Sequence, residues 1–162
     1  MEKNREQTDT FVLTDTIITP EYSKWLMVSS GFFSVPGVYA YYNNLHAMAL
    51  LLFITSLLSM NHWKNPRFNS IERKCDLVTA KVSFTVFFVR GIMNLKGTYT
   101  MCCGYSGLVS LLYCYYLSGK LYNNREIKWY KYHMGFHLFV ACEQLLVLTA
   151  ITNVNYPGSP IH

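Results

Sequence analysis

The chain has 162 residues, enough for one domain, and 51% of them are hydrophobic whereas only 14% are charged. Soluble domains carry roughly 25% charged residues, so this composition argues against a soluble globular protein and predicts an all-α, polytopic membrane helix bundle. The formal net charge of +5 comes from basic residues beside apolar segments, which indicates an anionic membrane surface rather than nucleic acid as the partner.

Residues 1–24 are expected to form a polar N-terminal tail, residues 25–152 the transmembrane bundle and residues 153–162 a short C-terminal tail. The N-terminal tail lacks the compact apolar stretch and small-residue cleavage site of a signal peptide. Its stretch TDTIITPE favours a short turn or the start of a helix before the membrane. The five cysteines are odd in number and show no C-x-x-C spacing, which favours neither a disulfide framework nor a cysteine metal site.

Apolar windows of near-membrane length fall at residues 25–42, 45–62, 77–95, 99–118 and 132–152, and each predicts a transmembrane helix. Pro36-Gly37 interrupts the first window and predicts a kink. Only YNN links the first window to the second, so these two helices are expected to form a tight hairpin. Small residues recur every three or four positions in the fourth window, a spacing that suits close helix packing. They are Cys103, Gly107, Ser110, Cys114 and Ser118.

Basic residues in the loops set the expected topology. The loop after the second window contains Lys64, Arg67, Arg73 and Lys74, and the loop after the fourth contains Lys120, Arg125, Lys128 and Lys131. With five spans, both loops lie on the same side as the N-terminus, which the positive-inside rule places in the cytoplasm, with the C-terminus on the opposite side. Trp25, Trp63 and Trp129 fall at this same interface, where indole rings are favoured.

Polar residues within the spans form one stripe on each of three helices. Thr55, Ser59 and His62 share a face of the second helix, Asp76, Thr79, Ser83 and Arg90 a face of the third, and His133, His137 and Gln144 a face of the fifth. Polar side chains are costly in hydrocarbon, so a bundle is expected to turn these stripes inward. The histidines and Asp76 would then meet near the cytoplasmic interface.

Three histidines and an aspartate at one membrane depth favour a zinc site. His133 and His137, spaced i and i+4, project from one helix face, and His62 would supply a third imidazole from another helix. A fourth position would remain open for a water whose pKa the metal lowers to about 7. Asp76 would then orient an imidazole or take the proton of this water, and Ser59 would assist by hydrogen bonding.

The run S-M-N-H from Ser59 to His62, Asp76, and the run H-M-G-F-H from His133 to His137 resemble the alkaline ceramidase, adiponectin-receptor and Per1-like superfamily of membrane hydrolases. The resemblance implies His62, His133 and His137 as zinc ligands, Asp76 and Ser59 beside the catalytic water, and hydrolysis of a lipid amide or ester, with ceramide as the familiar substrate. The superfamily has seven spans rather than five, and its serine precedes the histidine by four residues rather than three.

Other interpretations of the same residues stay open. The histidine pair could face lipid headgroups, Asp76 could cap a helix, and Ser59 could serve packing alone. Lys81 and Arg90 are expected to extend to the nearest interface, or Arg90 could pair with Glu143. The function would then be that of a membrane scaffold or receptor-like protein; a conducting bundle fits less well, because the apolar run LLVLTAITNV ends the fifth span. Membrane lipids are the expected partners, with the lipid substrate entering laterally, and a five-helix bundle leaves homo-oligomerisation open.

Overall fold

The computed structural model describes residues 16–155, and these residues form an all-α fold. The elements in chain order are α2 (Pro20–Ser30), the 3-10 helix η1 (Gly31–Phe33), α3 (Ser34–Tyr42), α4 (His46–Lys64), α5 (Ile71–Asn94), α6 (Thr98–Asn123) and α7 (Trp129–Asn155). Over residues 16–155 the only β pairing is an isolated bridge between Thr16 and Arg67. The prediction of an all-α fold is therefore confirmed.

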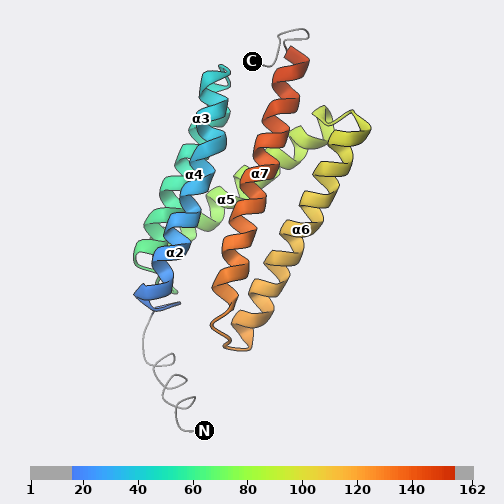
Figure 1. Ribbon diagram of the computed structural model, residues 1–162. Coiled ribbons are helices and arrows are strands. Elements are labelled where there is room, and N and C mark those ends of the chain that lie inside the picture. Colours follow the sequence, from blue (N-terminus) through green and yellow to red (C-terminus); the bar gives the residue numbers. More distant parts are fainter. Residues whose placement is uncertain (1–15, 156–162) are drawn as a thin grey trace, which may run out of the picture.

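The first predicted span is a continuous rod made of α2, η1 and α3 (Figure 1). Pro36 lies in the first turn of α3, directly after the 3-10 turn Gly31–Phe33. Because proline has no N–H and its ring crowds the carbonyl four residues earlier, the helix changes its winding around Phe32. The rod begins at Pro20, inside the expected polar tail, because proline suits the first turn of a helix and Ile17 and Ile18 are buried beside it.

A tight turn joins this rod to α4, as the short YNN link predicts. Asn44 adopts a positive φ of 60°, which asparagine tolerates better than most residues. The N–H of Leu45 then donates to the carbonyl of Ala40 at 2.9 Å, which closes the turn. As a result α3 and α4 run side by side (Figure 1).

Three helices extend beyond their apolar windows. Helix α5 begins at Ile71 rather than residue 77, because the Ser70 side chain accepts a hydrogen bond from the N–H of Arg73 and caps a polar first turn. Helix α6 continues to Asn123 and α7 starts at Trp129, so only a short turn, with Arg125 at a φ of 58°, separates them. Hydrophobic windows therefore located these helices but made them too short, because their terminal turns are polar.

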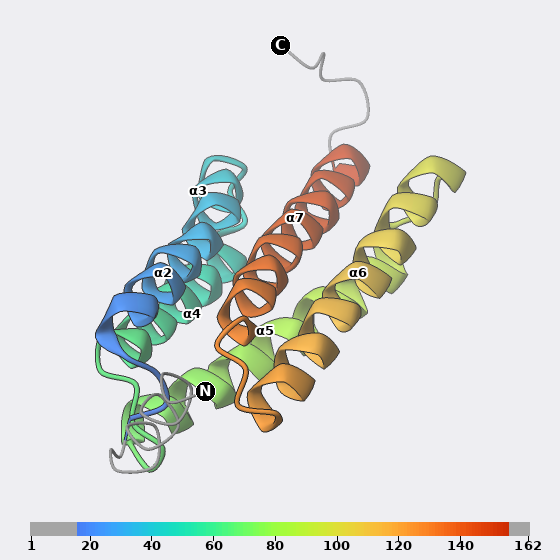
Figure 2. The same cartoon turned by 60° about the horizontal axis from the view of Figure 1, so that its bottom comes forward.

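Helix α7 occupies the centre of the bundle and packs against α2, α3, α5 and most extensively α6. Figures 1 and 2 show α6 alongside α7 on the outside, with α5 crossing beneath both. The α6–α7 contact uses the predicted small residues: a methyl group at Gly107 would overlap the carboxyl group of Glu143, and one at Gly135 would lie 3.3 Å from the sulfur of Cys114. The predicted close packing of α6 is therefore confirmed at Gly107 and Cys114, where α7 contacts it.

Helix α7 is the one described helix that is both long and apolar enough to cross a membrane, over Trp129–Asn153. The α4–α5 and α6–α7 links lie at the same end of the bundle, with the predicted basic residues in these links or in the adjoining helix turns, and there Trp63 and Trp129 approach to 6.2 Å between ring centroids. Both indoles are buried in a cluster with Ile17, Ile18 and Leu26. Trp25, in contrast, is exposed.

Candidate functional site

The end of the bundle that carries the basic links also holds the polar residues singled out by the sequence. His62 lies near the end of α4, Asp76 in the second turn of α5, and His133 and His137 in the first turns of α7. The inward orientation of the stripes is confirmed for α4, where Thr55, Ser59 and His62 are each 3% exposed. His137 and Gln144 of α7 are buried as well, at 3% and 2%.

The polar stripe of the third predicted helix, which is α5 in the structure, was predicted correctly only in part. Ser83 is buried and Asp76 and Thr79 are partly buried, but Arg90 is exposed and forms no ion pair with Glu143 within the described residues. Arg90 lies close to the end of α5, where its long side chain can extend outward. The alternative of an Arg90–Glu143 pair is thus not realised in this structure.

Trp63 joins the histidines of two helices into one cluster. The rings of His133 and His137 lie 4.7 Å apart between centroids. The indole of Trp63 lies 4.6 Å from the His62 ring and 5.3 Å from the His133 ring. Trp63 therefore lies between His62 and His133, which are 71 positions apart in the sequence, and His137 adjoins His133; we call His62, His133 and His137 the histidine cluster.

Two serines fix the orientation of the α7 histidines. Nδ1 of His137 lies 2.9 Å from the Ser29 hydroxyl, and Nδ1 of His133 lies 3.3 Å from the Ser118 hydroxyl. Ser29 has a single hydroxyl proton, and it donates this proton to the carbonyl of Leu26 at 2.9 Å. The Ser29 oxygen therefore accepts a hydrogen bond from Nδ1–H of His137, which leaves a lone pair on Nε2 of the neutral ring.

His62 differs from the other two histidines because its Nδ1 is buried and has no hydrogen-bond partner among residues 16–155. A buried polar atom without a partner costs roughly 1–3 kcal/mol, so it needs an explanation in a folded protein. The ring is 3% exposed and its neighbour Trp63 cannot accept a hydrogen bond.

A pair of buried hydroxyl groups lies near Asp76. The Ser59 hydroxyl lies 3.0 Å from that of Ser30, and Ser59 is close to the carboxyl group of Asp76. Ser30 in turn donates to the carbonyl of Leu26 or to Ser59. The carboxyl group of Asp76, in the second turn of α5, therefore lies close to the Ser59 hydroxyl of α4, which in turn contacts Ser30 of α2.

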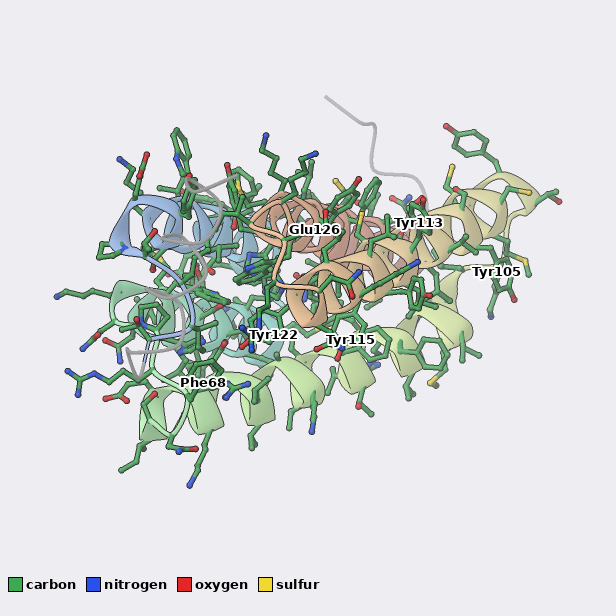
Figure 3. The ribbon with its side chains drawn as sticks, turned by 90° about the horizontal axis from the view of Figure 1, so that it is seen from below. Phe68, Tyr105, Tyr113, Tyr115, Tyr122 and Glu126 are labelled. Carbon is green, nitrogen blue, oxygen red and sulfur yellow. The ribbon has the colours of Figure 1, made fainter. Side chains whose placement is uncertain are left out.

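Aromatic side chains surround the cluster. Phe33 contacts the His137 ring edge-on at 5.1 Å, and Trp129 contacts the His133 ring at 5.9 Å. Phe68, from the α4–α5 link, and Tyr122, from the end of α6, pack against the Trp63–Trp129 core at this end, which Figure 3 shows from below. These contacts lower the local dielectric and hold the rings in place.

The structure gathers His62, His133 and His137 at one end of the bundle and places Ser59 and Asp76 at that same end, but within residues 16–155 Asp76 makes no hydrogen bond or ion pair with a histidine. Within residues 16–155, however, no three His, Cys, Asp or Glu side chains are arranged as a ready metal-binding group. Sequence reasoning missed Ser29 and the hydrogen bond of Ser118, and it assigned Trp63 to the membrane interface. The one sequence feature that could have indicated the role of Ser29 was the pair Ser29-Ser30 in an otherwise apolar segment.

No protein-family model, curated protein or solved structure matches this chain.

Proposed function

We propose that this chain is a multi-pass membrane protein whose histidine cluster binds zinc and hydrolyses an amide or ester bond of a lipid. The proposal rests on one observation above all. Three imidazoles meet at one end of the bundle, two of them with Nδ1 held by serine and the third with a buried, unpartnered Nδ1. This is the arrangement that orients histidines for metal binding.

The lengths and surfaces of the helices support a membrane location. Helices α4 to α7 have 19, 24, 26 and 27 residues, or roughly 28 to 40 Å at the usual helical rise, against a hydrocarbon core of about 30 Å. Large apolar side chains cover their outer faces, with Leu57, Val78 and Val109 each more than 60% exposed. Apolar surface on this scale is unusual in a soluble monomer and suits contact with lipid. In this topology the basic links face the cytoplasm.

The donor set fits zinc, because neutral imidazole nitrogens are among its preferred ligands. His62, His133 and His137 would hold the ion. The chemistry that zinc supplies in such sites is a water acidified to a pKa of about 7. The nitrogen of His137 that would face the metal is its Nε2, because Ser29 accepts the hydrogen bond from Nδ1.

The other residues of the site would handle protons and position the substrate. Asp76 would accept a proton from the attacking water and pass it to the leaving amine or alcohol. Ser59 holds the carboxylate in place and, together with Ser30, links it to the bundle interior. The lipid would enter laterally, with its scissile bond at headgroup depth and its chains remaining among the apolar helices.

Metal removal and restoration test this function directly. We expect the detergent-purified protein to contain about one zinc per chain, because one histidine cluster is available. It should hydrolyse a fluorogenic short-chain lipid amide or its ester analogue, lose this activity on chelation and regain it with zinc. Elemental mass spectrometry gives the metal content. If the protein takes up no metal even after zinc supplementation, the hydrolase proposal is wrong and a membrane scaffold is the better description.

Replacing Ser29 by alanine should lower zinc affinity by about 10- to 100-fold, the usual cost of losing an outer hydrogen-bond partner of a metal ligand. The His137 ring would lose the contact that fixes its tautomer while keeping its own nitrogens. Ser34→Ala is the matched control, because among residues 16–155 the Ser34 hydroxyl bonds only to the carbonyl of Gly31. Competition with a fluorescent zinc chelator measures both variants. Equal affinities for the two would contradict the role given to Ser29.

A further inference from the structure

A separate cavity lies between α5, α6 and α7, toward the end of the bundle opposite Phe68 and Tyr122. Its volume is about 330 Å³, within the range of about 300–1,000 Å³ typical of small-molecule sites. Its walls are mostly apolar, with Phe84 and Phe88 from α5, Leu108 from α6 and Val140 from α7. Tyr105, at the end of α6 remote from Tyr122 in Figure 3, also lines it. The cavity uses none of the residues of the histidine cluster.

One polar group in the cavity wall is buried and has an unused hydrogen-bond acceptor. Gln144 is 2% exposed, and its Nε2 donates to the Ser83 hydroxyl at 3.2 Å. The carbonyl oxygen, Oε1, is buried and has no hydrogen-bond partner among the described residues. A ligand that donates a hydrogen bond would satisfy it.

The second polar group is the carboxyl group of Glu143. It lies against the glycine face of α6, where a methyl group at Gly107 would overlap it and one at Gly104 would lie 3.8 Å from Oε2. Within residues 16–155 it has no hydrogen bond or ion pair, and Arg90 on α5 is exposed and unpaired with it. Glu143 is partly buried among these apolar walls, where a charged carboxyl group is costly unless a cation or donors compensate its charge.

We infer that this cavity binds an amphiphile with an apolar chain and a cationic amine head, which donates to the Glu143 carboxylate and to Oε1 of Gln144. Both protein groups accept hydrogen bonds, so the head must supply at least two donors. The charge of Glu143 favours an ammonium over a hydroxyl and disfavours an anion. The apolar walls then take the alkyl chain. This site goes beyond the proposed hydrolase function and does not depend on zinc.

Binding of decylamine, decanol and decanoate to the full-length protein in detergent tests the inference. These probes share a chain length and differ in their head groups. We expect decylamine to bind at least about tenfold more tightly than decanol, since a hydrogen bond to a charged group contributes roughly 1.4 kcal/mol or more. Decanoate should not bind. Isothermal titration calorimetry, with a blank titration into detergent alone, gives the affinities.

Two pairs of variants assign the binding to this cavity. Glu143→Gln should weaken decylamine binding about 10- to 100-fold and remove the preference over decanol, whereas Glu126→Gln, in the exposed α6–α7 link, should change neither. Leu108→Trp should block both ligands by filling the cavity, whereas Leu112→Trp, on a half-exposed position one turn along α6, should not. The Leu108 pair keeps the test valid if Glu143→Gln does not fold.

Equal binding of decylamine and decanol to the wild-type protein would overturn the inference, as would full decylamine binding by Leu108→Trp. Neither result bears on zinc content or hydrolysis, which are measured separately. Conversely, a protein without zinc that still selects decylamine would retain this site and lose only the hydrolase proposal.

Discussion

Replacing His137 by alanine is expected to reduce the zinc content of the purified protein from about one ion per chain to background. The ring is 3% exposed, and it is held by Ser29 at Nδ1 and by Phe33 and His133 on its faces. Loss of one of three imidazoles leaves too few ligands for a stable site. Hydrolysis of the lipid amide should fall with the metal. Elemental mass spectrometry and the hydrolysis assay measure the two effects on the same sample.

His46→Ala is the matched control for this variant. His46 begins α4 at the opposite end of the bundle, where it is exposed and contacts Tyr41 at 5.6 Å. It should therefore keep full zinc content and activity. Circular dichroism and size-exclusion chromatography separate loss of metal from loss of fold. A folded His137→Ala protein that retains its zinc would show that the histidine cluster is not the metal site.

The second large effect is expected from Asp76→Asn. Asparagine has the shape of aspartate and can still hydrogen-bond to Ser59, but it cannot take up a proton at neutral pH. We therefore expect kcat to fall by about 10²- to 10⁴-fold, the usual contribution of a general base, while zinc content stays unchanged. This combination of lost turnover and retained metal distinguishes a proton-transfer role from a ligand role or from a helix cap.

Glu72→Gln controls for the loss of a carboxylate from the same region. Glu72 is in the first turn of α5, one turn before Asp76, and its side chain is exposed. Its substitution should leave kcat close to the wild-type value. If Asp76→Asn were as active as Glu72→Gln, Asp76 would have no part in proton transfer, and its contact with Ser59 would be structural.

Hydrophobic windows were sufficient to locate the five helical segments, because the apolar stretches in this chain are long and well separated. The same reasoning placed the ends of α5, α6 and α7 too far inside, since polar turns such as Ile71–Asp76 continue a helix once a cap such as Ser70 is present. Helical phase predicted the inward faces of α4 and α7. It failed for Arg90, whose position near a helix end lets the side chain leave the interior.

The site was predictable only in part. Spacing and topology indicated that His62, Asp76 and the α7 histidines would lie at one end, and the structure places them there. The hydrogen bond between Ser29 and His137 joins residues 108 positions apart, and no local pattern encodes such a pairing. Trp63 was assigned to the interface by its residue type, but it packs between histidines because α4 continues past His62 to Lys64.

Helix α6 packs mainly against α7, and α7 is therefore its principal anchor to the rest of the bundle. Its two ends serve different places: Ser118 holds His133 in the histidine cluster, whereas Gly104 and Gly107 enclose Glu143 at the cavity. One rigid helix therefore contributes side chains or backbone to each place, and a substitution that displaces α6 from α7 should disturb both the Ser118–His133 contact and the wall of the cavity.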